Sequence, residues 1–217
     1  MIPAHENKRE VTSLDRIISK VKNGLLLNSI RNQLVRIGII ITPYYWVQEG
    51  INPTELPEIN GIISDYTVEF IQAEDIIRIG ENVRTYSLDG LLAYFKAGKK
   101  CLGLKHKDKI ASFMFIDLKE CNFLSINIPL KNDEAYLTHM YTMESFRGRN
   151  LAPYLRYKSY EILKKMGRNK IYSVSVFFNS SAIRYKEKLN AKNIKLILYV
   201  EILKRLKRSF TLKTYKS

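Results

Sequence analysis

A basic turn between a strand and a helix is the feature that most constrains this chain. The sequence Arg147-Gly148-Arg149-Asn150-Leu151-Ala152 follows the alternating run 135–142 and precedes the helical run 153–166. A turn in this place directs several backbone N–H groups outward at the positive end of a helix dipole, and two arginines reinforce it. The sequence therefore predicts an anion site here, and a pyrophosphate is the natural partner.

Hydrophobic periodicity around this turn predicts a mixed α/β fold. The expected helices are 12–36, 73–79, 88–97, 153–166 and 181–189, and the expected strands are 37–48 with a break at Pro43, 65–72, 101–105, 110–118, 123–129, 135–142, 171–178 and 194–203. The loop 51–60 contains Pro53 and Pro57 and is the best candidate boundary. We expect residues 1–60 to form an extension or sub-domain and residues 61–217 to form the main domain.

Composition excludes few partners. The 217 residues are 46% hydrophobic and 26% charged, which is typical of a globular protein, and their net charge is +15. Such a charge attracts polyanions, but it does not choose among nucleic acid, anionic membrane, coenzyme A and nucleotide-sugars. Cys101 and Cys121 lie in apolar segments and are expected to be buried thiols. The longest apolar run, 37–41, is too short to cross a bilayer, and no apolar signal-peptide core precedes it, so a cytoplasmic enzyme is expected.

A second motif follows about thirty residues after the basic turn. It reads Phe178-Asn179-Ser180-Ser181-Ala182-Ile183-Arg184-Tyr185-Lys186-Glu187-Lys188-Leu189. Together the two segments resemble the acetyl-coenzyme A signature of the GNAT superfamily, the acyl-CoA-dependent N-acyltransferases. In the first motif Arg147 and Ala152 match the family pattern, and in the second Asn179, Ala182 and the helix end match it.

The resemblance implies a fold, a co-substrate and a set of binding residues. The fold is a GNAT-type α/β (α+β) structure, a mixed and largely antiparallel sheet flanked by helices, in which the pantetheine of acyl-CoA lies between two splayed strands. No metal is required. Backbone N–H groups near Thr142 and Met143 would polarise the thioester carbonyl. The implied cofactor-binding residues are Tyr141, Thr142, Met143, Arg147, Gly148, Arg149, Asn150, Leu151, Ala152, Asn179 and Ala182.

Two departures from the family pattern concern individual residues. Asn150 occupies a usual glycine position, and asparagine tolerates the left-handed backbone better than most residues do. The tyrosine that often protonates the leaving thiolate aligns with Lys186, whereas Tyr185 stands one residue early. A one-residue shift turns a helical side chain by about 100°. Tyr185 and Lys186 are therefore both candidate general acids, and a water or another tyrosine is the alternative.

The attacking amine must also lose a proton. Glu134 lies at the start of the strand before the basic turn, where the family often has a carboxylate, and His139 lies in the middle of that strand. Both are candidate bases, and plain packing is the alternative for His139.

Three features favour a dTDP- or UDP-linked amino-deoxy sugar as the acceptor. They are the long non-matching N-terminal part, the possible stacking surface of Tyr44, Tyr45 and Trp46, and the basic excess. The segment 140–191 is similar to N-acyltransferases of bacterial surface-polysaccharide pathways, and the acyl group is acetyl or longer, such as hydroxybutyryl. Packing within a strand is the alternative for the aromatic cluster. A protein, peptide or polyamine acetyltransferase and a non-catalytic basic module are the competing functions.

The sequence also bears on membrane, nucleic-acid and oligomer partners. Residues 192–217 hold eight Lys and Arg against one Glu, so a membrane surface is a conceivable partner. Nucleic acid is not expected, because basic residues interleave with an aromatic only at 205–210, which is more typical of a charged edge strand. An oligomer is possible.

Overall fold

The computed structural model describes residues 33–50, 55–83 and 85–215. Contacts divide the chain into two units. One unit comprises Met1–Thr42 and Tyr199–Arg208, and the other comprises Pro43–Leu198 and Ser209–Ser217. The boundary that the sequence suggests near residue 60 stays a prediction. An acceptor-site role for residues 1–60 stays a prediction.

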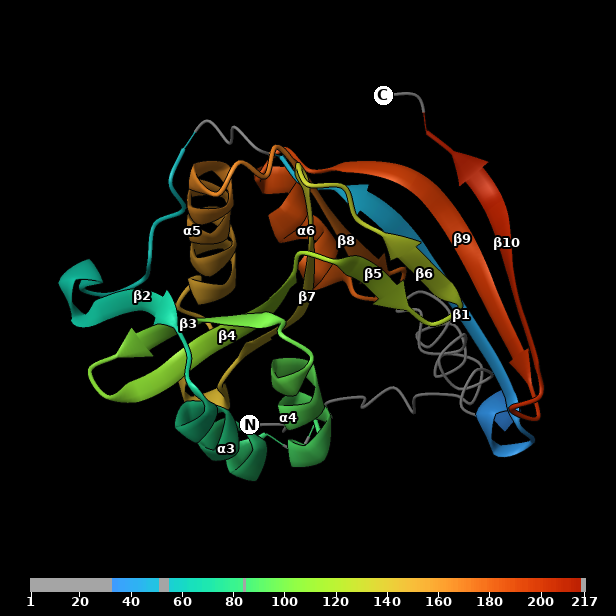
Figure 1. The fold of residues 1–217 in the computed structure, drawn as a ribbon, viewed down its shortest axis with the longest axis horizontal. Helices are drawn as coiled ribbons and strands as arrows, with labels where there is room; N and C mark the ends of the chain where they lie inside the picture. The colour runs from blue at the N-terminus through green and yellow to red at the C-terminus, as the bar shows by residue number, and fades with distance from the viewer. Residues whose placement is uncertain (1–32, 51–54, 84, 216–217) are drawn as a thin grey trace, which may run out of the picture. The chain divides into compact units, whose positions relative to one another are not determined.

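The elements confirm the expected alternation of strands and helices (Figure 1). In chain order they are β1 (Ile39–Gln48), η1 (Ile63–Asp65), β2 (Tyr66–Phe70), α3 (Ala73–Asn82), α4 (Leu88–Lys96), β3 (Lys100–His106), β4 (Lys109–Asp117), β5 (Glu120–Phe123), β6 (Ile126–Pro129), β7 (Glu134–Thr142), η2 (Glu144–Phe146), α5 (Leu151–Lys165), β8 (Lys170–Val176), α6 (Ser180–Lys188), β9 (Lys192–Ile202) and β10 (Leu206–Thr214).

The strands form a mixed, largely antiparallel sheet, as the sequence predicted. Its order is β10-β9-β1-β8-β7-β4-β3-β2, and β1, β9 and β10 each have residues in both units. Within the larger unit β7 and β8 run parallel, whereas the pairs β1–β8, β2–β3, β3–β4 and β4–β7 are antiparallel. The single strand expected over 123–129 is instead the hairpin β5–β6, because the chain turns at Leu124 with a positive φ.

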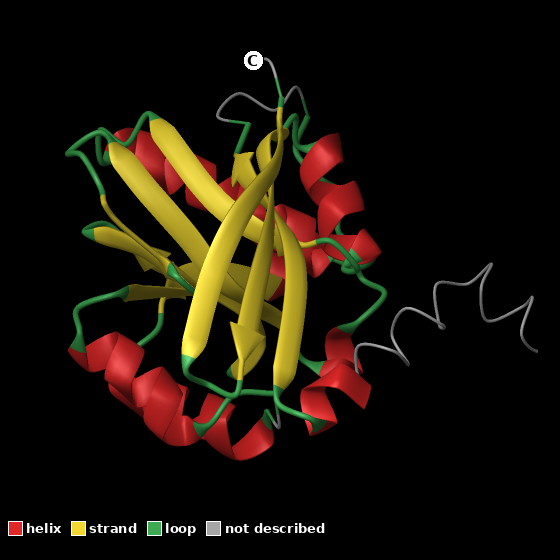
Figure 2. Cartoon of the chain, turned by 90° about the vertical axis from the view of Figure 1, so that its right-hand side faces the viewer, coloured by secondary structure: helices red, strands yellow, loops and turns green. Residues whose placement is uncertain are grey.

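Helices cover both faces of the sheet in the larger unit (Figure 2). Successive side chains of β4 point to opposite faces. Phe113 and Phe115 pack with residues of α3 and α4, whereas Met114 and Ile116 pack with residues of α5 and with Leu189 at the end of α6. The two hydrophobic clusters hold β3 and β4 between α5 on one face and α3 and α4 on the other.

The parallel strands β7 and β8 part halfway along their length. Their paired residues run from Glu134↔Lys170 to Leu137↔Ser173, yet β7 continues to Thr142 and β8 to Val176. The register between β4 and β7 also shifts just beyond this point, where His139 has a φ of +52°. This opening is the splayed strand pair that the family resemblance implied.

The helix ends are set by local sequence, and the left-handed backbone expected at Asn150 is confirmed. Asn150 adopts the left-handed conformation at the start of α5, with a φ of 60°, and Asn190 does so after α6, with a φ of 59°. The side chain of Ser87 accepts a hydrogen bond from the Gly90 N–H at the start of α4, and that of Asn179 accepts one from the Ala182 N–H at the start of α6.

Several expectations concern the rest of the chain. The helix expected over 12–36 lies outside the described residues except at 33–36, which are helical. Pro43 does not break β1, because its carbonyl still accepts a hydrogen bond from Phe177 N–H. Cys101 and Cys121 are buried free thiols, as expected.

Within the described ranges, no helix has the length and apolar character needed to cross a membrane.

Gly50 permits a close backbone approach that the fold requires. A Cβ at this position would lie 2.1 Å from the Leu189 carbonyl oxygen and 2.8 Å from the Asn190 carbonyl carbon. We predict that Gly50→Ala lowers the free energy of unfolding by about 2–3 kcal/mol in a urea titration, because backbone must move.

Gly90→Ala is the matched control. Its Cβ would meet only the Ser87 hydroxyl, at 2.9 Å, so we expect a change below about 1 kcal/mol. Equal losses in the two variants would contradict the prediction.

Candidate functional site

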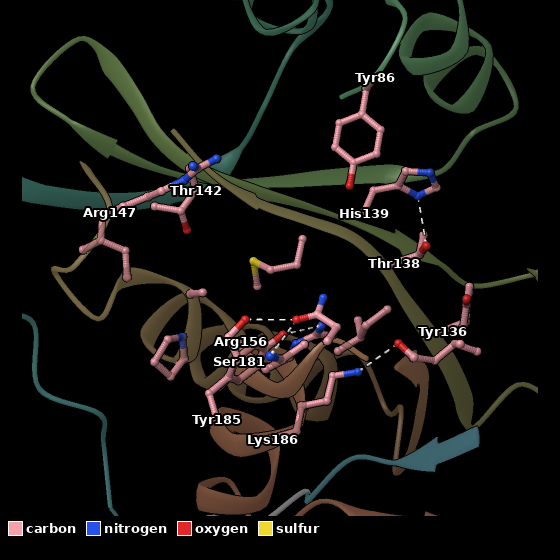
Figure 3. Close-up of a pocket in the computed structure, with 18 of the residues that line it drawn as sticks. Tyr86, Tyr136, Thr138, His139, Thr142, Arg147, Arg156, Ser181, Tyr185 and Lys186 are labelled. Carbon is pink, nitrogen blue, oxygen red and sulfur yellow. Dashed lines mark hydrogen bonds between the residues drawn. The ribbon is translucent and has the colours of Figure 1, made fainter. Parts of the chain in front are cut away.

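A cavity of about 720 Å³ lies at the opening between β7 and β8. Helices α5 and α6 contribute Arg156, Ser181, Tyr185 and Lys186 to one side, and Tyr86, Thr138 and His139 lie across from them (Figure 3). Most of the residues expected to bind the cofactor line it, namely Thr142, Arg147, Gly148, Asn150, Leu151, Ala152, Asn179 and Ala182.

The carbonyl groups of the basic turn are held by a neighbouring loop. Asn60 donates from its backbone N–H to the Arg149 carbonyl (3.1 Å) and from Nδ2 to the Gly148 carbonyl (2.9 Å). The Asn150 side chain in turn donates to the Glu58 carbonyl (2.6 Å). In a trans peptide the N–H points opposite to the carbonyl, so the N–H groups of Arg149 and Asn150 point away from Asn60. The turn thus keeps the exposed N–H groups that an anion site needs.

The two arginine side chains of the turn have different surroundings. Arg147 borders the cavity, donates to the Tyr141 hydroxyl (3.2 Å) and the Thr142 carbonyl (3.3 Å), and pairs with Glu144 (3.6 Å). Arg149 does not line the cavity; it donates to the Tyr66 hydroxyl (3.3 Å) and lies over the Phe146 ring. Only Arg147 is therefore placed to reach a ligand directly.

The end of β7 offers one of the two N–H groups expected there. Met143 N–H already donates to the Ala111 carbonyl (2.9 Å), toward β4. Successive N–H groups of a strand point to opposite edges, so Thr142 N–H faces the edge from which β8 has parted. Tyr141 and Met143 line a second cavity, of about 550 Å³, rather than the main one.

His139 lies among aromatic rings at the far side of the main cavity. Its ring centroid is 4.5 Å from that of Tyr94, 5.2 Å from Tyr86 and 6.0 Å from Phe115, and Nδ1 is 2.9 Å from the Thr138 hydroxyl. Burial, with a smaller effect from Lys99, lowers the pKa of His139 from 6.5 to about 4. The imidazole is therefore neutral at neutral pH.

Other residues selected from the sequence lie outside the main cavity. Glu134 accepts hydrogen bonds from Lys131 N–H (3.0 Å) and from the Tyr172 hydroxyl (3.5 Å), so it stabilises the turn at the start of β7. Tyr44 is fully buried against Phe123.

The neighbours of Tyr44 are also engaged in packing. Tyr45 stacks on Phe177, and Trp46 stacks on Tyr136. The structure thus places the aromatic cluster in the packing between strands, and not on the main cavity.

A buried charge cluster forms the floor of the main cavity. Glu49, at the end of β1, has a fully buried side chain and lies 3.8 Å from Arg156 and 3.7 Å from Lys186, whose side chains are 3% and 5% exposed. Glu49 also accepts from the hydroxyls of Tyr160 and Ser173. Burial alone would raise the pKa of Glu49, but the two cations and two hydroxyls hold it below its usual value. Burial lowers the pKa of Lys186 to about 8.

Sequence reasoning did not select several residues of this site. They are Glu49, Arg156 and the aromatic side chains Tyr86, Tyr94 and Tyr136. Arg156 could have been recognised from the sequence, because it shares a helix face with Ala152, Ser159 and Leu163. A cation on such a buried face requires a buried partner. Tyr86 and Tyr94, just before and within α4, lie far in the sequence from Tyr136 on β7.

Comparisons with known proteins agree on the fold. No family model and no curated protein matches the chain. Among solved structures, it is similar to an acetyltransferase of the GNAT family from Colwellia psychrerythraea (13% identity, 80% of this chain and 61% of the other, TM-score 0.55) and to a GCN5-related N-acetyltransferase from Kribbella flavida (12%, 78% and 62%, TM-score 0.51).

A third match is a glucosamine N-acetyltransferase region in a fungal multi-domain GH3 β-N-acetylglucosaminidase (9%, 81% and 23%, TM-score 0.59). The chain spans about three fifths of the length of the first structures that it matches. These likenesses and the geometry above show that the chain has the GNAT fold.

The depressed pKa of His139 predicts an acid-sensitive fold. The unfolded state, with a pKa near 6.5, binds the proton before the folded state, with a pKa near 4. The stability contributed by the neutral ring is therefore complete above pH 6.5 and is lost as the pH falls toward 4.

We predict that wild type loses on the order of 1 kcal/mol more than His139→Gln between pH 7 and pH 5, measured by urea unfolding. NMR titration gives the direct check. A His139 resonance that titrates near pH 6.5 would contradict the assigned environment.

Proposed function

We propose that this protein is an acyl-CoA-dependent N-acyltransferase. The proposal rests on two features that border the same cavity. One is the basic turn, whose Gly148 and Arg149 carbonyls accept hydrogen bonds from Asn60, and the other is the opening between strands β7 and β8. The turn suits a pyrophosphate, and the opening suits an extended pantetheine arm beside it.

The binding roles follow from these positions. The backbone of 147–152 would bind the pyrophosphate, assisted by the Arg147 side chain. Asn179 already caps α6 with its side-chain oxygen, so its amide nitrogen is the group left for the pantetheine. No metal enters this scheme.

The reaction is a direct attack of the acceptor amine on the thioester carbon. Thr142 N–H supports the developing oxyanion, and neutral His139 accepts the amine proton directly or through water. Tyr185 and Lys186 both line the cavity and are the candidates for protonating the departing thiolate. Glu134 is not a candidate base in this scheme, because its carboxylate holds the turn at the other end of β7.

The lining of the main cavity favours a neutral or anionic acceptor. Its charged side chains are Arg147, Arg156 and Lys186, and no Asp or Glu lies among the described residues that line it. A polyamine or a lysine-rich peptide would meet like charge there.

The far side of the cavity suits a flat ring. Tyr86, Tyr94 and Phe123 line it, and aromatic side chains stack on sugar and base rings. We therefore propose an amino-deoxy sugar carried on a dTDP or UDP nucleotide as acceptor. The glucosamine specificity named for the fungal structural neighbour supports an amino sugar.

A thiol-release assay tests this function. Acetyl-CoA and longer acyl-CoAs would be incubated with dTDP- and UDP-linked amino sugars, with free glucosamine, spermidine and a basic peptide as comparison acceptors. We expect thiol release with a nucleotide-linked amino sugar. Thiol release only with spermidine or the peptide would reject the sugar acceptor but leave the acyltransferase function in place. If the protein neither releases thiol nor binds acyl-CoA, the acyltransferase function is rejected.

Removing the Asn60 side chain should weaken acyl-CoA binding. Asn60→Ala frees the Gly148 carbonyl to turn toward the ligand, and we predict a rise of about 5- to 30-fold in the acyl-CoA dissociation constant, corresponding to about 1–2 kcal/mol. Isothermal calorimetry gives the constant. Asn127→Ala, at an exposed position of β6, is the control and should bind as wild type does. Unaltered binding by Asn60→Ala would place the pyrophosphate elsewhere.

A further inference from the structure

The buried cluster below the main cavity carries more positive than negative charge. Arg156 and Lys186 contribute two cations, and Glu49 contributes the one carboxylate that pairs with them among the described residues. Buried charges of this kind are tolerated when they are paired and hydrogen-bonded. An excess positive charge at the point where β7 and β8 part can stabilise an anion that forms there only during a reaction.

The protons of Lys186 are all taken up by acceptors of the protein. Its Nζ donates to the Ser173 hydroxyl (2.7 Å), the Ser175 hydroxyl (2.8 Å) and the Val174 carbonyl (3.1 Å), all on β8. An ammonium group has three protons, so these three acceptors use its full capacity. Lys186 therefore fastens α6 to β8, and it holds no proton for a ligand in the cavity.

Tyr185 is arranged in the opposite way. Its hydroxyl oxygen lies 3.2 Å from Arg156 Nη2 and accepts a hydrogen bond from it, because a guanidinium can only donate. The hydroxyl's own proton is thereby left for another acceptor, and Tyr185 lines the cavity. Arg156 also has two buried nitrogen atoms, Nε and Nη1, without a hydrogen-bond partner, so its charge is only partly compensated by Glu49.

We propose that Glu49 and Arg156 are positioning residues that make Tyr185, and not Lys186, the proton donor to the departing thiolate. This inference rests on the proposed acyltransferase function and names the acid that it leaves open. Glu49 holds Arg156 under the cavity floor, and Arg156 orients the Tyr185 hydroxyl and stabilises its anion.

The step balances with the groups named. The amine nitrogen bonds to the thioester carbon, the carbon–sulfur bond breaks, and the thiolate takes the proton of the Tyr185 hydroxyl. The phenolate that remains faces the Arg156 guanidinium, so the excess positive charge of the cluster is neutralised. The proton lost by the amine later restores the phenol through solvent.

The geometry also accounts for the departure at position 186. A tyrosine one residue early would point about 100° away on the helix, yet Tyr185 still borders the cavity. Arg156, from the second turn of α5, reaches its hydroxyl. Lysine at 186 supplies the second cation around Glu49.

The test is steady-state kinetics on Tyr185→Phe with the best acceptor from the thiol-release assay. We expect kcat to fall about 100-fold or more, while the calorimetric dissociation constant for acetyl-CoA stays within about twofold of wild type. Tyr157→Phe, on α5 and outside the cavity lining, should retain wild-type kcat. Arg156→Met should resemble Tyr185→Phe, and Arg156→Lys, which keeps a donor and a charge, should recover part of the loss.

Two results would overturn the inference. One is a Tyr185→Phe enzyme with a kcat within about threefold of wild type, well short of the loss expected for an acid. The other is a wild-type kcat that falls above about pH 8, where Lys186 loses its proton, with the fall absent from Lys186→Met. Thermal unfolding would accompany each variant, and if Arg156 or Lys186 variants do not fold, Tyr185→Phe and the wild-type pH profile still decide.

Failure of the proposed function looks different from failure of this inference. If wild type releases no thiol with any acceptor, the acyltransferase proposal fails, and the role of Tyr185 as its general acid fails with it. If wild type is active and Tyr185→Phe is equally active, the transferase stands and only the assignment of the acid is lost.

Discussion

The carboxylate of Glu49 is the group on which the centre of this structure depends. It is fully buried, and it joins the end of β1 to three consecutive elements much later in the sequence: α5 through Arg156 and Tyr160, β8 through Ser173, and α6 through Lys186. A buried carboxylate without these partners would be costly, so the segments must assemble together. Gly50, the next residue, lets β1 approach the end of α6 closely enough for this to happen.

This assembly also defines the cavity. Strand β8 is tied to α6 by Lys186 at the point where it stops pairing with β7, so the two strands stay apart beyond Leu137 and Ser173. The opening is thus maintained by buried polar contacts on one strand, and by the change of register between β4 and β7 on the other. The turn proposed to bind an anion lies at the start of α5, the helix that also carries Arg156, so the proposed ligand site and the charge cluster share one helix.

The sequence by itself determined the local features. Strand and helix periodicity and the left-handed Asn150 depend on neighbours within a few residues, and they were predicted. The caps at Ser87 and Asn179 are local in the same sense. The basic turn followed by a helix was also predicted, and its proposed role as an anion site depends on backbone geometry that a short sequence specifies. The resemblance to the GNAT superfamily came from the two sequence motifs, and the order of the predicted elements agreed with it.

Only the tertiary structure decided which side chains meet. Periodicity assigns a residue to a face but does not say what lies opposite, so Trp46 suited a ligand surface in the sequence and stacks on Tyr136 in the fold. Glu134 was likewise adjacent in sequence to the expected site but faces another turn. The charge cluster joins Glu49 to Arg156 and Lys186, each more than a hundred residues from it in the sequence, and no local pattern indicates such a pairing. The reason is physical: the energy of a buried ion depends on partners that only folding brings within reach.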